Sequence, residues 1–412
     1  MDATAGTFAE LSAGIDLEAA RRAIGDRAVR TPAIASPELA EMAGGPVLLK
    51  AESLQVSGSF KLRGALAKLA ALGPLAEHGL IAASAGNHAR AVAQAARLAG
   101  VGCQVFMPRD APVSKVAAVE RLGAGVRLSG ASVEDALELA RAAAQDSGAA
   151  LIHPFDDPDV IAGQGTLGLE LVEQVPDLAR VIVPVGGGGL ACGIGLALLR
   201  ERPGVELIGV QASACAPLPA LLAGTEVAEV EAPAAATIAD GIALKRPGAL
   251  TLPLLRRLLG SVQTVAEEQI ADAMVLLAER AKLVAEGAGA VAVAALMRRE
   301  LPPVAGTTVA IVSGGNVDAG LLASLLRRQE TAAGRRVRLL TRVPDRPGGL
   351  AELLRLVAEA RANLLTLEHL REAVALGVRE TAVELTLETR GPEHTEQLGE
   401  ALRAAGYEVS FE

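Results

Sequence analysis

The sequence predicts an α/β protein with two lobes, each built on a parallel β-sheet, followed by a small βαββαβ module. Three observations support this prediction. Short apolar runs alternate with segments of helical periodicity over roughly three quarters of the chain. A different pattern, of alternating strands and amphipathic helices, begins after residues 331–336. The 412 residues also exceed the usual size of one domain, so we expect more than one.

The predicted strands of the long α/β region share an apolar, β-branched character. They are PVLLKAE, GLIAASA, CQVFMP, GVRLSG, ALIHPF, RVIVPV, ELIGVQA and TTVAIVS. Between them lie segments with apolar residues at helical spacing, such as NHARAVAQAARLA and ASVEDALELARAAAQ. Short strands joined by helices indicate parallel sheets covered on both faces. Because eight strands are many for one open sheet, we expect two lobes with a cleft between them.

We place the boundaries of the α/β region at residues 1–330. The large lobe is expected at about 1–50 and 150–330, and the small lobe at about 51–149. Residues 331–336, with the sequence TAAGRR, form the expected linker to a module at residues 337–412.

The C-terminal module is predicted to be ferredoxin-like. VRLLTRV alternates apolar residues or Thr with Arg, and DRPGG then turns the chain. Two amphipathic helices follow this strand in the pattern βαββαβ. Their apolar faces are expected to carry Leu350, Leu353, Leu354 and Val357 in the first helix, and Leu398, Ala401, Leu402 and Ala405 in the second.

Composition excludes several classes of function. The net charge is −9, and no basic stripe indicates nucleic acid. The three Cys lie far apart and the five His show no paired spacing, which argues against a disulfide framework or a zinc site. Val181–Leu199 carries no charge, but its six Gly and one Pro are unsuited to a membrane helix. With no signal peptide visible, we expect a soluble cytoplasmic protein.

Four stretches could carry chemistry. In VIVPVGGGGLACG a strand runs into four glycines and a helix, so backbone N–H groups could bind a phosphate; close packing of helix on strand is the alternative. Lys61, in SGSFKLRGA, could offer its amine to an aldehyde cofactor, although a lone Lys is usually a surface residue. SAGNHARAVA and VAIVSGGN also join strand to helix, and their polar residues could bind a ligand or simply cap a helix.

Together these stretches, with TIADGIALKRPG and AEGAGAVAVAAL, resemble the fold-type II pyridoxal-phosphate enzymes, whose fold is like that of the tryptophan synthase β subunit. Within that group the chain is similar to the threonine dehydratases, also called threonine ammonia-lyases. The resemblance covers roughly residues 15–328, and the order and spacing of the motifs make it specific. It implies pyridoxal 5'-phosphate as the cofactor and an amino acid as the substrate.

The resemblance also assigns residues. Lys61 matches the catalytic lysine that joins the cofactor covalently. The other expected cofactor-binding residues are Phe60 and Gly241 beside the ring, Asn87 at the ring hydroxyl, Ser313 at the pyridine nitrogen, and Gly186, Gly187, Gly188, Gly189 and Leu190 at the phosphate. The loop expected to hold the substrate carboxylate comprises Ser84, Ala85, Gly86, Asn87 and His88. Glu286 is typical of the family and is expected near the cleft, without an assigned role.

The implied reaction is β-elimination from L-threonine to 2-oxobutanoate and ammonia, with L-serine giving pyruvate as a side activity. An L-serine or hydroxyaspartate dehydratase remains an alternative, because one methylene changes such discrimination by only about 1–3 kcal/mol. A serine racemase is less favoured: racemases resembling this chain carry a second Ser in the carboxylate loop, where this sequence has Ala85. A non-catalytic amino-acid sensor is the remaining alternative, and the intact site motifs argue against it.

Two further expectations concern ions and regulation. Relatives that bind a divalent metal carry acidic residues near the positions of Gln211 and Pro217, so we expect no such metal here. The C-terminal module resembles an ACT domain, which implies an amino-acid or other small effector. The positions that match its effector pocket are Asp345, Gly348, Gly349 and Asn363. We expect a homodimer or homotetramer; the sequence identifies neither the effector nor a biosynthetic or degradative role.

Overall fold

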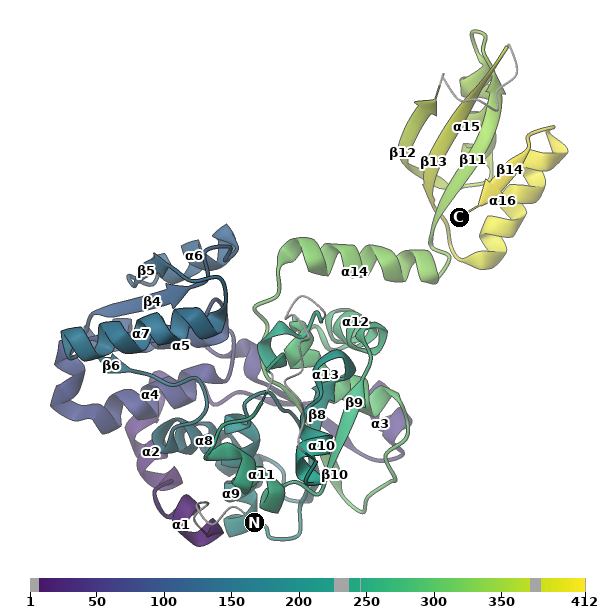
Figure 1. Cartoon of the computed structure of the whole chain (residues 1–412). Coiled ribbons are helices and arrows are strands. Elements are labelled where there is room, and N and C mark those ends of the chain that lie inside the picture. The colour runs from purple at the N-terminus through teal and green to yellow at the C-terminus, as the bar shows by residue number, and fades with distance from the viewer. Residues whose placement is uncertain (1–6, 226–236, 245, 371–378, 412) are drawn as a thin grey trace. The chain divides into compact units, whose positions relative to one another are not determined.

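The computed structural model describes residues 7–225, 237–244, 246–370 and 379–411 (Figure 1). The chain divides into two compact units, Met1–Asp318 and Ala319–Glu412. The division precedes helix α14 (Ala319–Ala332), whereas the sequence analysis placed the boundary after residue 330. Helix α14 ends four residues before the next strand begins, so the expected linker at 331–336 is partly helical and partly strand.

Two parallel sheets form the first unit, as the sequence predicts. The larger sheet has the order β1-β2-β10-β7-β8-β9, and only its edge strand β1 is antiparallel to its neighbour. These strands are β1 (Ala33–Ala35), β2 (Val47–Ala51), β7 (Leu178–Pro184), β8 (Glu206–Ala212), β9 (Ser261–Val265) and β10 (Thr307–Val312). The smaller sheet, β5-β4-β3-β6, is entirely parallel. Its strands are β3 (Leu80–Ala83), β4 (Cys103–Met107), β5 (Gly125–Leu128) and β6 (Ala150–Leu151).

Helices connect these strands. They are α1 (Phe8–Ala13), α2 (Leu17–Ile24), α3 (Pro37–Ala43), α4 (Lys61–Leu72), α5 (Asn87–Ala99), α6 (Val113–Glu120), α7 (Val133–Ser147), α8 (Pro158–Gln174), α9 (Gly189–Glu201), α10 (Leu218–Leu222), α11 (Thr251–Leu258), α12 (Glu267–Leu276) and α13 (Gly287–Met297). The uncharged stretch Val181–Leu199 is a strand, a turn and a helix, as expected. Among the described residues, no helix combines the length and apolar composition that crossing a bilayer requires.

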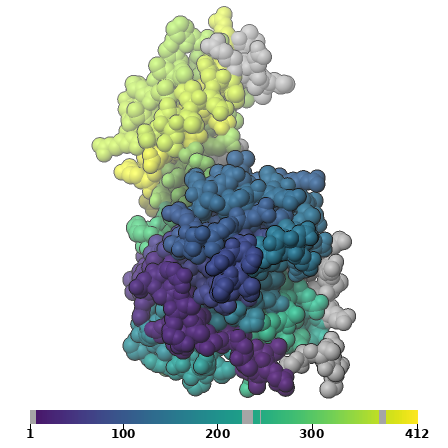
Figure 2. Space-filling model, turned by 90° about the vertical axis from the view of Figure 1, so that its left-hand side faces the viewer, coloured from purple at the N-terminus to yellow at the C-terminus, as the bar shows by residue number. Residues whose placement is uncertain are grey.

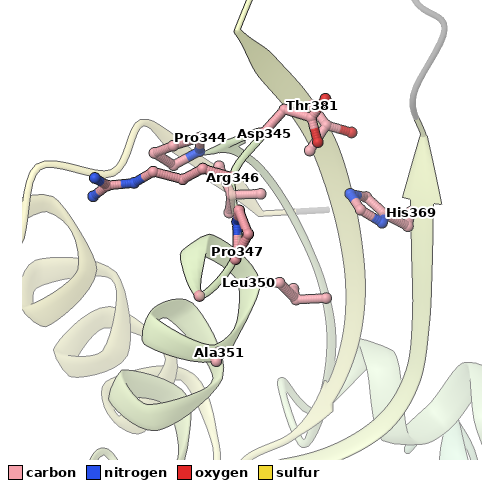
Figure 3. A pocket seen from close by; sticks show the side chains of 10 residues that line it. Pro344, Asp345, Arg346, Pro347, Leu350, Ala351, His369 and Thr381 are labelled. Atoms are coloured by element: carbon pink, nitrogen blue, oxygen red, sulfur yellow. The ribbon is translucent and has the colours of Figure 1, made fainter.

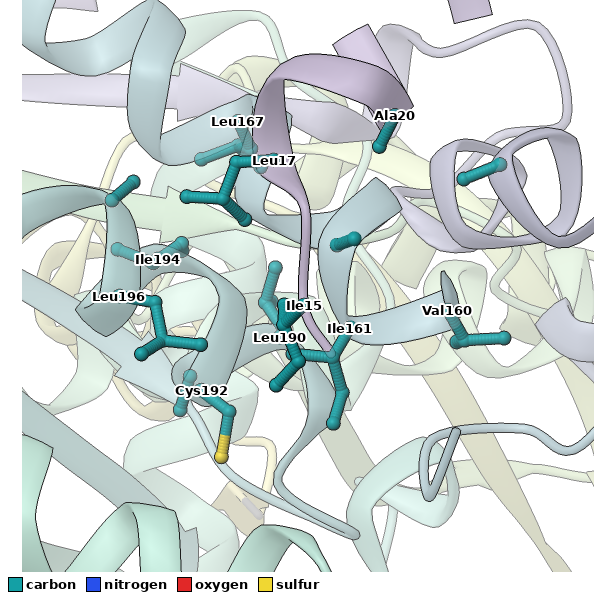
Figure 4. Packing of buried hydrophobic residues seen from close by; sticks show 14 of the residues in the cluster. Ile15, Leu17, Ala20, Val160, Ile161, Leu167, Leu190, Cys192, Ile194 and Leu196 are labelled. Carbon is teal, nitrogen blue, oxygen red and sulfur yellow. The ribbon is translucent and has the colours of Figure 1, made fainter. Parts of the chain in front are cut away.

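The interior of the large lobe depends on a very close crossing of α8 and α9. A Cβ on Gly168 would lie 2.6 Å from the Ala197 Cβ, and one on Gly193 would lie 2.5 Å from the Gly165 backbone nitrogen. Side chains of α2, including Leu17, fill the space beside this crossing (Figure 4). Close packing of this kind requires glycine on both helices, and it fixes the start of α9 relative to α8.

Helix α4 contacts elements of both lobes. It packs on α8 of the large lobe, on α5 of the small lobe and on α2. Figure 2 shows the N-terminal residues (purple) lying beside the blue surface formed by the residues that follow them. The first residue of α4 is Lys61, so the position of this helix sets the position of the lysine.

The second unit contains the ferredoxin-like module predicted from the sequence. Its elements are β11 (Arg336–Pro344), α15 (Gly349–Glu359), β12 (Asn363–Leu370), β13 (Glu380–Glu388), α16 (Pro392–Ala404) and β14 (Val409–Phe411), and the antiparallel sheet has the order β12-β13-β11-β14. The buried face of α16 differs from the expected one. Leu398 and Leu402 are buried, but Ala401 and Ala405 are exposed, and His394 is buried instead. The His394 Nε2 lies 2.7 Å from the Ala360 carbonyl oxygen, which satisfies a polar side chain in the core.

Candidate active site

Lys61 occupies the first turn of α4, directly after Phe60. Its Nζ donates a hydrogen bond to the Pro154 carbonyl oxygen at 2.7 Å and lies 5.2 Å from the centre of the Phe60 ring. Burial lowers the pKa of the Lys61 amine to about 8, while the Glu286 carboxyl opposes this shift. A substantial fraction of this amine is therefore neutral near physiological pH, which is the form that attacks an aldehyde.

The loop before Lys61 is joined to the end of β10. The Phe60 backbone N–H donates to the Ser313 carbonyl at 3.1 Å, and Ser59 forms a β-bridge with Gly314. The buried hydroxyl of Ser313 donates to the Ala288 carbonyl at 3.4 Å. The same alanine lies beside Gly241, where an added Cβ would be 3.0 Å from the Ala288 Cβ. Phe60, Gly241 and Ser313 therefore belong to one cluster.

Asn87 opens helix α5 of the small lobe and contacts two residues of the large lobe. Its amide Nδ2 donates to the Glu286 carboxyl, and its Oδ1 accepts from Asn316 Nδ2 at 2.5 Å. Asn316 also donates to the Ser57 carbonyl at 3.0 Å. With Oδ1 occupied by Asn316, the remaining Nδ2 hydrogen of Asn87 stays available as a donor to a ligand.

Glu286 is buried, and burial raises its pKa to about 7, with a further rise from Asp240. The hydrogen bond from Asn87 and the charges of Lys115 and Arg90 oppose this rise. Lys115 (small lobe, α6) and Asp240 (large lobe) also form an ion pair at 2.8 Å. Glu286 thus lies where the two lobes meet, and it carries a carboxyl that can change charge near neutral pH.

The SAGNH segment forms the turn between β3 and α5. The Ser84 hydroxyl accepts from the Gly86 N–H at 3.0 Å, while the first-turn N–H groups of α5 have no acceptor within the helix. These groups and the positive end of the helix suit a carboxylate. The His88 side chain is buried and its Nε2 lies 2.8 Å from the Ile152 carbonyl; burial lowers its pKa to about 3. A contribution of His88 to anion binding would therefore come from its backbone N–H.

Each glycine of the loop is closely packed on the side where a Cβ would stand. An added Cβ on Gly186 would lie 3.0 Å from Ile242, one on Gly187 would overlap the Phe155 ring, and one on Gly189 would lie 2.9 Å from the Phe155 carbonyl oxygen. Gly188 has φ +94°, and an added Cβ there would lie 2.8 Å from the Leu255 side chain. Close packing therefore accounts for all four glycines, including the left-handed conformation of Gly188.

The Thr251 hydroxyl fixes the direction of one peptide of the loop. The Thr251 hydroxyl donates to the Gly187 carbonyl at 2.6 Å, so the N–H of the following trans peptide points the opposite way, away from Thr251. Helix α9 begins at Gly189, and its first-turn N–H groups, including that of Leu190, also lack intrahelical acceptors. A phosphate fits this donor set. Because Phe155 follows Pro154, the carbonyl bound to Lys61 is one residue from the side chain that packs on the loop.

The residues predicted from the sequence are thus gathered around one site, while several supporting residues were not predicted. These are Pro154, Phe155, Thr251 and Asn316, together with the contact made by Glu286. Only Asn316 had a visible signal, because it ends the SGGN motif after β10. Pro154 acts through its backbone carbonyl and Phe155 through packing, and the contacts of Thr251 and Glu286 join residues that are far apart in the sequence.

One of the two positions considered for a metal, Gln211, has hydrogen-bond partners within the protein. The Gln211 amide donates to the Val185 carbonyl at 3.1 Å and accepts from the Leu218 N–H at 2.9 Å. Over the described ranges, no group of three or more His, Cys, Asp or Glu side chains is arranged to hold a metal ion. Cys192 and Cys215 are buried.

The second unit has a cavity of about 390 Å³ beside the turn between β11 and α15 (Figure 3). Of the four residues predicted for an effector, Asp345 and Gly348 line this cavity and Gly349 follows Gly348 at the start of α15. Asn363 is not among the lining residues; its Nδ2 donates to the Glu388 carboxyl at 3.1 Å. His369 and Thr381 line the cavity from the sheet, and the Arg346 side chain extends away from them (Figure 3).

Comparison with known proteins identifies the class of enzyme. Residues 24–314 match the family described as pyridoxal-phosphate dependent enzyme, and the chain belongs to this family. Its fold is fold-type II and its cofactor is pyridoxal phosphate.

The individual relatives are more specific. The chain is 44% identical over 396 residues to the L-threonine ammonia-lyase of Thermotoga maritima, covering 96% of this chain and 98% of that relative. The crystal structure of the T.th. threonine deaminase is 42% identical, covers 74% of this chain and 98% of that chain, and gives a TM-score of 0.69. Maize serine racemase is 34% identical, covers 77% of this chain and 99% of its own, and gives a TM-score of 0.71.

Proposed function

We propose that this protein is an L-threonine ammonia-lyase, which converts L-threonine to 2-oxobutanoate and ammonia and acts more slowly on L-serine. The observation that carries the proposal is the setting of Lys61. Its amine, with a pKa lowered to about 8, lies beside the segment that packs on the glycine loop. The similarity to an L-threonine ammonia-lyase over nearly the full length of both chains supports the choice of reaction.

In this proposal the residues have separate tasks. When bound, pyridoxal phosphate supplies an electron sink for the charge that develops when the substrate Cα loses its proton. The glycine loop and Leu190 would hold the phosphate, the Asn87 amide would donate to the ring hydroxyl, and Phe60 and Gly241 would border the ring. The Ser313 hydroxyl, which donates to the Ala288 carbonyl in this structure, would turn to the pyridine nitrogen as a neutral partner that does not impose a proton on it.

The turn before α5 and the Lys61 amine are proposed to act on the substrate itself. The turn from Ser84 to His88 binds the substrate carboxylate through backbone N–H groups at the start of α5. Once the substrate amine has replaced Lys61 at the cofactor, the freed amine of Lys61 would remove the Cα proton, because burial keeps part of its population unprotonated. The β-hydroxyl group would take up a proton and leave as water, and the resulting enamine would tautomerise and be hydrolysed by water to the 2-oxo acid and ammonia.

The test compares wild type with Lys61→Ala. The wild-type protein should show a cofactor absorbance band and release 2-oxobutanoate from threonine; Lys61→Ala should lose both. Lys68→Ala on the same helix is the matched control. The Lys68 amine forms ion pairs with Asp157 and Asp159 and not with the site residues, so this variant should retain both the absorbance band and turnover. Turnover by Lys61→Ala at the wild-type rate would contradict the proposal, and kcat/KM for threonine against serine decides between threonine and serine dehydratase.

Serine racemisation is the second candidate, because the maize racemase shares the fold at 34% identity. Ala85 argues against it, since a methyl group cannot exchange a proton on the second face of Cα. D-serine should therefore not accumulate during turnover of L-serine.

We further propose that the cavity beside α15 binds a small effector, as in ACT domains. The cavity lies beside the start of an eleven-residue helix, whose positive end suits a carboxylate. Asp345 and His369 line other sides of the cavity, and the Asp345 carboxylate suits an ammonium group, so the lining fits an amino acid. Equilibrium dialysis with individual amino acids, on wild type and on Gly348→Ala, tests this. Gly348 has φ +92°, so its substitution strains the turn and should weaken binding. No retention of any of the twenty amino acids would contradict the proposal.

We propose a cytoplasmic homo-oligomer, a dimer or a tetramer, with residues 1–318 as the catalytic unit and the ferredoxin-like module as the regulatory one. The division of the chain at Asp318 and the separate hydrophobic core of the module support the assignment of two units with separate roles. Light scattering on the purified protein gives the mass of the assembly, and a monomer would contradict it.

A further inference from the structure

Beneath Lys61 lies a buried set of four charged residues that the reaction itself does not use. Lys50, Glu52 and Arg63 are almost completely buried, and the Glu170 side chain is 15% exposed. Two positive and two negative charges make the set neutral. We name these four residues the ion cluster.

Arg63 is the centre of the ion cluster. Its guanidinium donates to both oxygens of Glu52, at 2.9 and 2.8 Å, and to both oxygens of Glu170, at 2.6 and 3.0 Å. The Lys50 amine completes the set with bonds to Glu170 at 2.5 Å and to the Thr31 carbonyl at 2.8 Å. Burial disfavours the charge on Arg63, but Glu52 and Glu170 outweigh this effect and raise its pKa, so Arg63 stays ionised.

The location of the ion cluster relates it to Lys61. Glu52 follows strand β2, and Arg63 comes two residues after Lys61, so their bidentate pair joins the two ends of the segment that leads into α4. Residues two apart on a helix point about 200° away from each other. Lys61 can therefore face the site while Arg63 faces the interior.

Glu170 extends the connection to α8. The crossing of α4 and α8 is very close, because a Cβ on Gly163 would lie 2.5 Å from the Arg63 carbonyl oxygen. Together with the bond from Phe60 to Ser313, these contacts tie the first turn of α4 to β2, α8 and β10, all in the large lobe. Asn87 and the carboxylate-binding turn belong to α5 and the small lobe.

We propose that Arg63 and its ion cluster are positioning residues for Lys61, and that they hold its amine in register with the glycine loop. The inference rests on the proposed function only in taking Lys61 as the residue that bonds the cofactor. Displacement of a reacting group by about 1 Å reduces the rate about 100-fold, so loss of the cluster should reduce catalysis without preventing substrate binding.

The experiment uses a charge-balanced double variant, Arg63→Met with Glu52→Gln, which leaves Lys50 opposite Glu170. In the holoenzyme, kcat should fall about 10- to 100-fold with KM changed less than about threefold. Two readings do not depend on turnover: backbone amides at the start of α4 should exchange hydrogen faster, and the cofactor band should form more slowly when pyridoxal phosphate is added to the apoprotein.

Arg180→Met is the matched control. Arg180 is also buried and pairs with Glu206 at 2.6 Å, but it lies on β7. The control should lower the melting temperature and leave kcat and the rate of cofactor binding unchanged. If the double variant does not fold, Arg63→Lys, which keeps the charge but not the planar fork, should show the same changes at smaller size.

A variant that loses melting temperature like Arg180→Met, yet keeps wild-type kcat, amide exchange and rate of cofactor binding, would overturn the positioning role. Lack of threonine turnover in wild type would overturn the proposed function alone, because amide exchange and cofactor binding still test the ion cluster.

Discussion

Asn87, in the small lobe, donates its side-chain amide to the buried carboxyl of Glu286, in the large lobe. This contact places a titratable group next to the residue proposed to bind the cofactor ring hydroxyl. The charge of Glu286 therefore bears both on the stability of the fold and on the orientation of that amide.

We expect Glu286→Gln to stabilise the protein at pH 8 relative to wild type, and to have little effect at pH 4. The pKa of Glu286 is raised to about 7 in the folded chain from an ordinary 4.5, so its favourable contribution is complete below about 4.5 and is lost as pH rises through 7. The difference should approach about 3 kcal/mol, since each pKa unit corresponds to about 1.4 kcal/mol. Urea unfolding of the apoprotein at several pH values measures it. Asp240→Asn is the control and should shift the transition to lower pH; a difference independent of pH would contradict the prediction.

The amine of Lys61 should react with pyridoxal phosphate at a rate that rises tenfold per pH unit and levels off above about pH 8. An ordinary lysine, with a pKa near 10.4, would continue to accelerate beyond pH 9. The cause is burial, which lowers the pKa of Lys61 to about 8. Stopped-flow absorbance on the apoprotein gives the rate, with Lys61→Ala as the background. A rate still rising at pH 10 would show that the amine is not desolvated.

Thr251→Val should weaken binding of the cofactor about 5- to 100-fold, because it removes the hydroxyl that holds the Gly187 carbonyl at 2.6 Å. The same hydroxyl accepts from the Gly248 N–H at 2.8 Å. Thr251→Ser keeps the hydroxyl and is the control. Titration of apoprotein with pyridoxal phosphate, followed by absorbance, measures the dissociation constant; equal affinities in the two variants would exclude a role for the hydroxyl.

Ala85→Ser should introduce slow racemisation of serine while retaining elimination. The new hydroxyl would stand in the turn that is proposed to bind the substrate carboxylate, where racemases resembling this chain carry serine. Chiral chromatography of the products from L-serine detects D-serine, with wild type as the control. No D-serine beyond the wild-type amount would mean that a second proton carrier requires more than this one side chain.

The sequence predicts most of the fold because buried strands and packed helices leave periodic apolar patterns. The eight expected strands are present, whereas β1 and β9 were not expected. Both are edge strands: β1 has three residues between two prolines, and β9 contains Gln263 and Thr264. An edge strand is covered less completely, so it requires no continuous apolar run.

The site was predictable in part for a related reason. Glycines, Lys61 and Asn87 belong to short motifs at strand ends, and their roles were assigned through resemblance to a family. The ion cluster was not predictable, because Glu170 is far along the chain from the other three residues, and all four read singly as surface charges. These residues are buried only because the tertiary fold packs α4, α8 and the end of β2 together.

The confinement of the glycine loop has a consequence for how this protein can diversify. Phe155, Ile242 and Leu255 each exclude a methyl group from a different part of the loop, so random mutagenesis should leave the four-glycine stretch unvaried among functional clones. New substrate preferences would then have to arise in the opposite lobe, through the turn that begins at Ser84, while the anchor for the phosphate stays as it is.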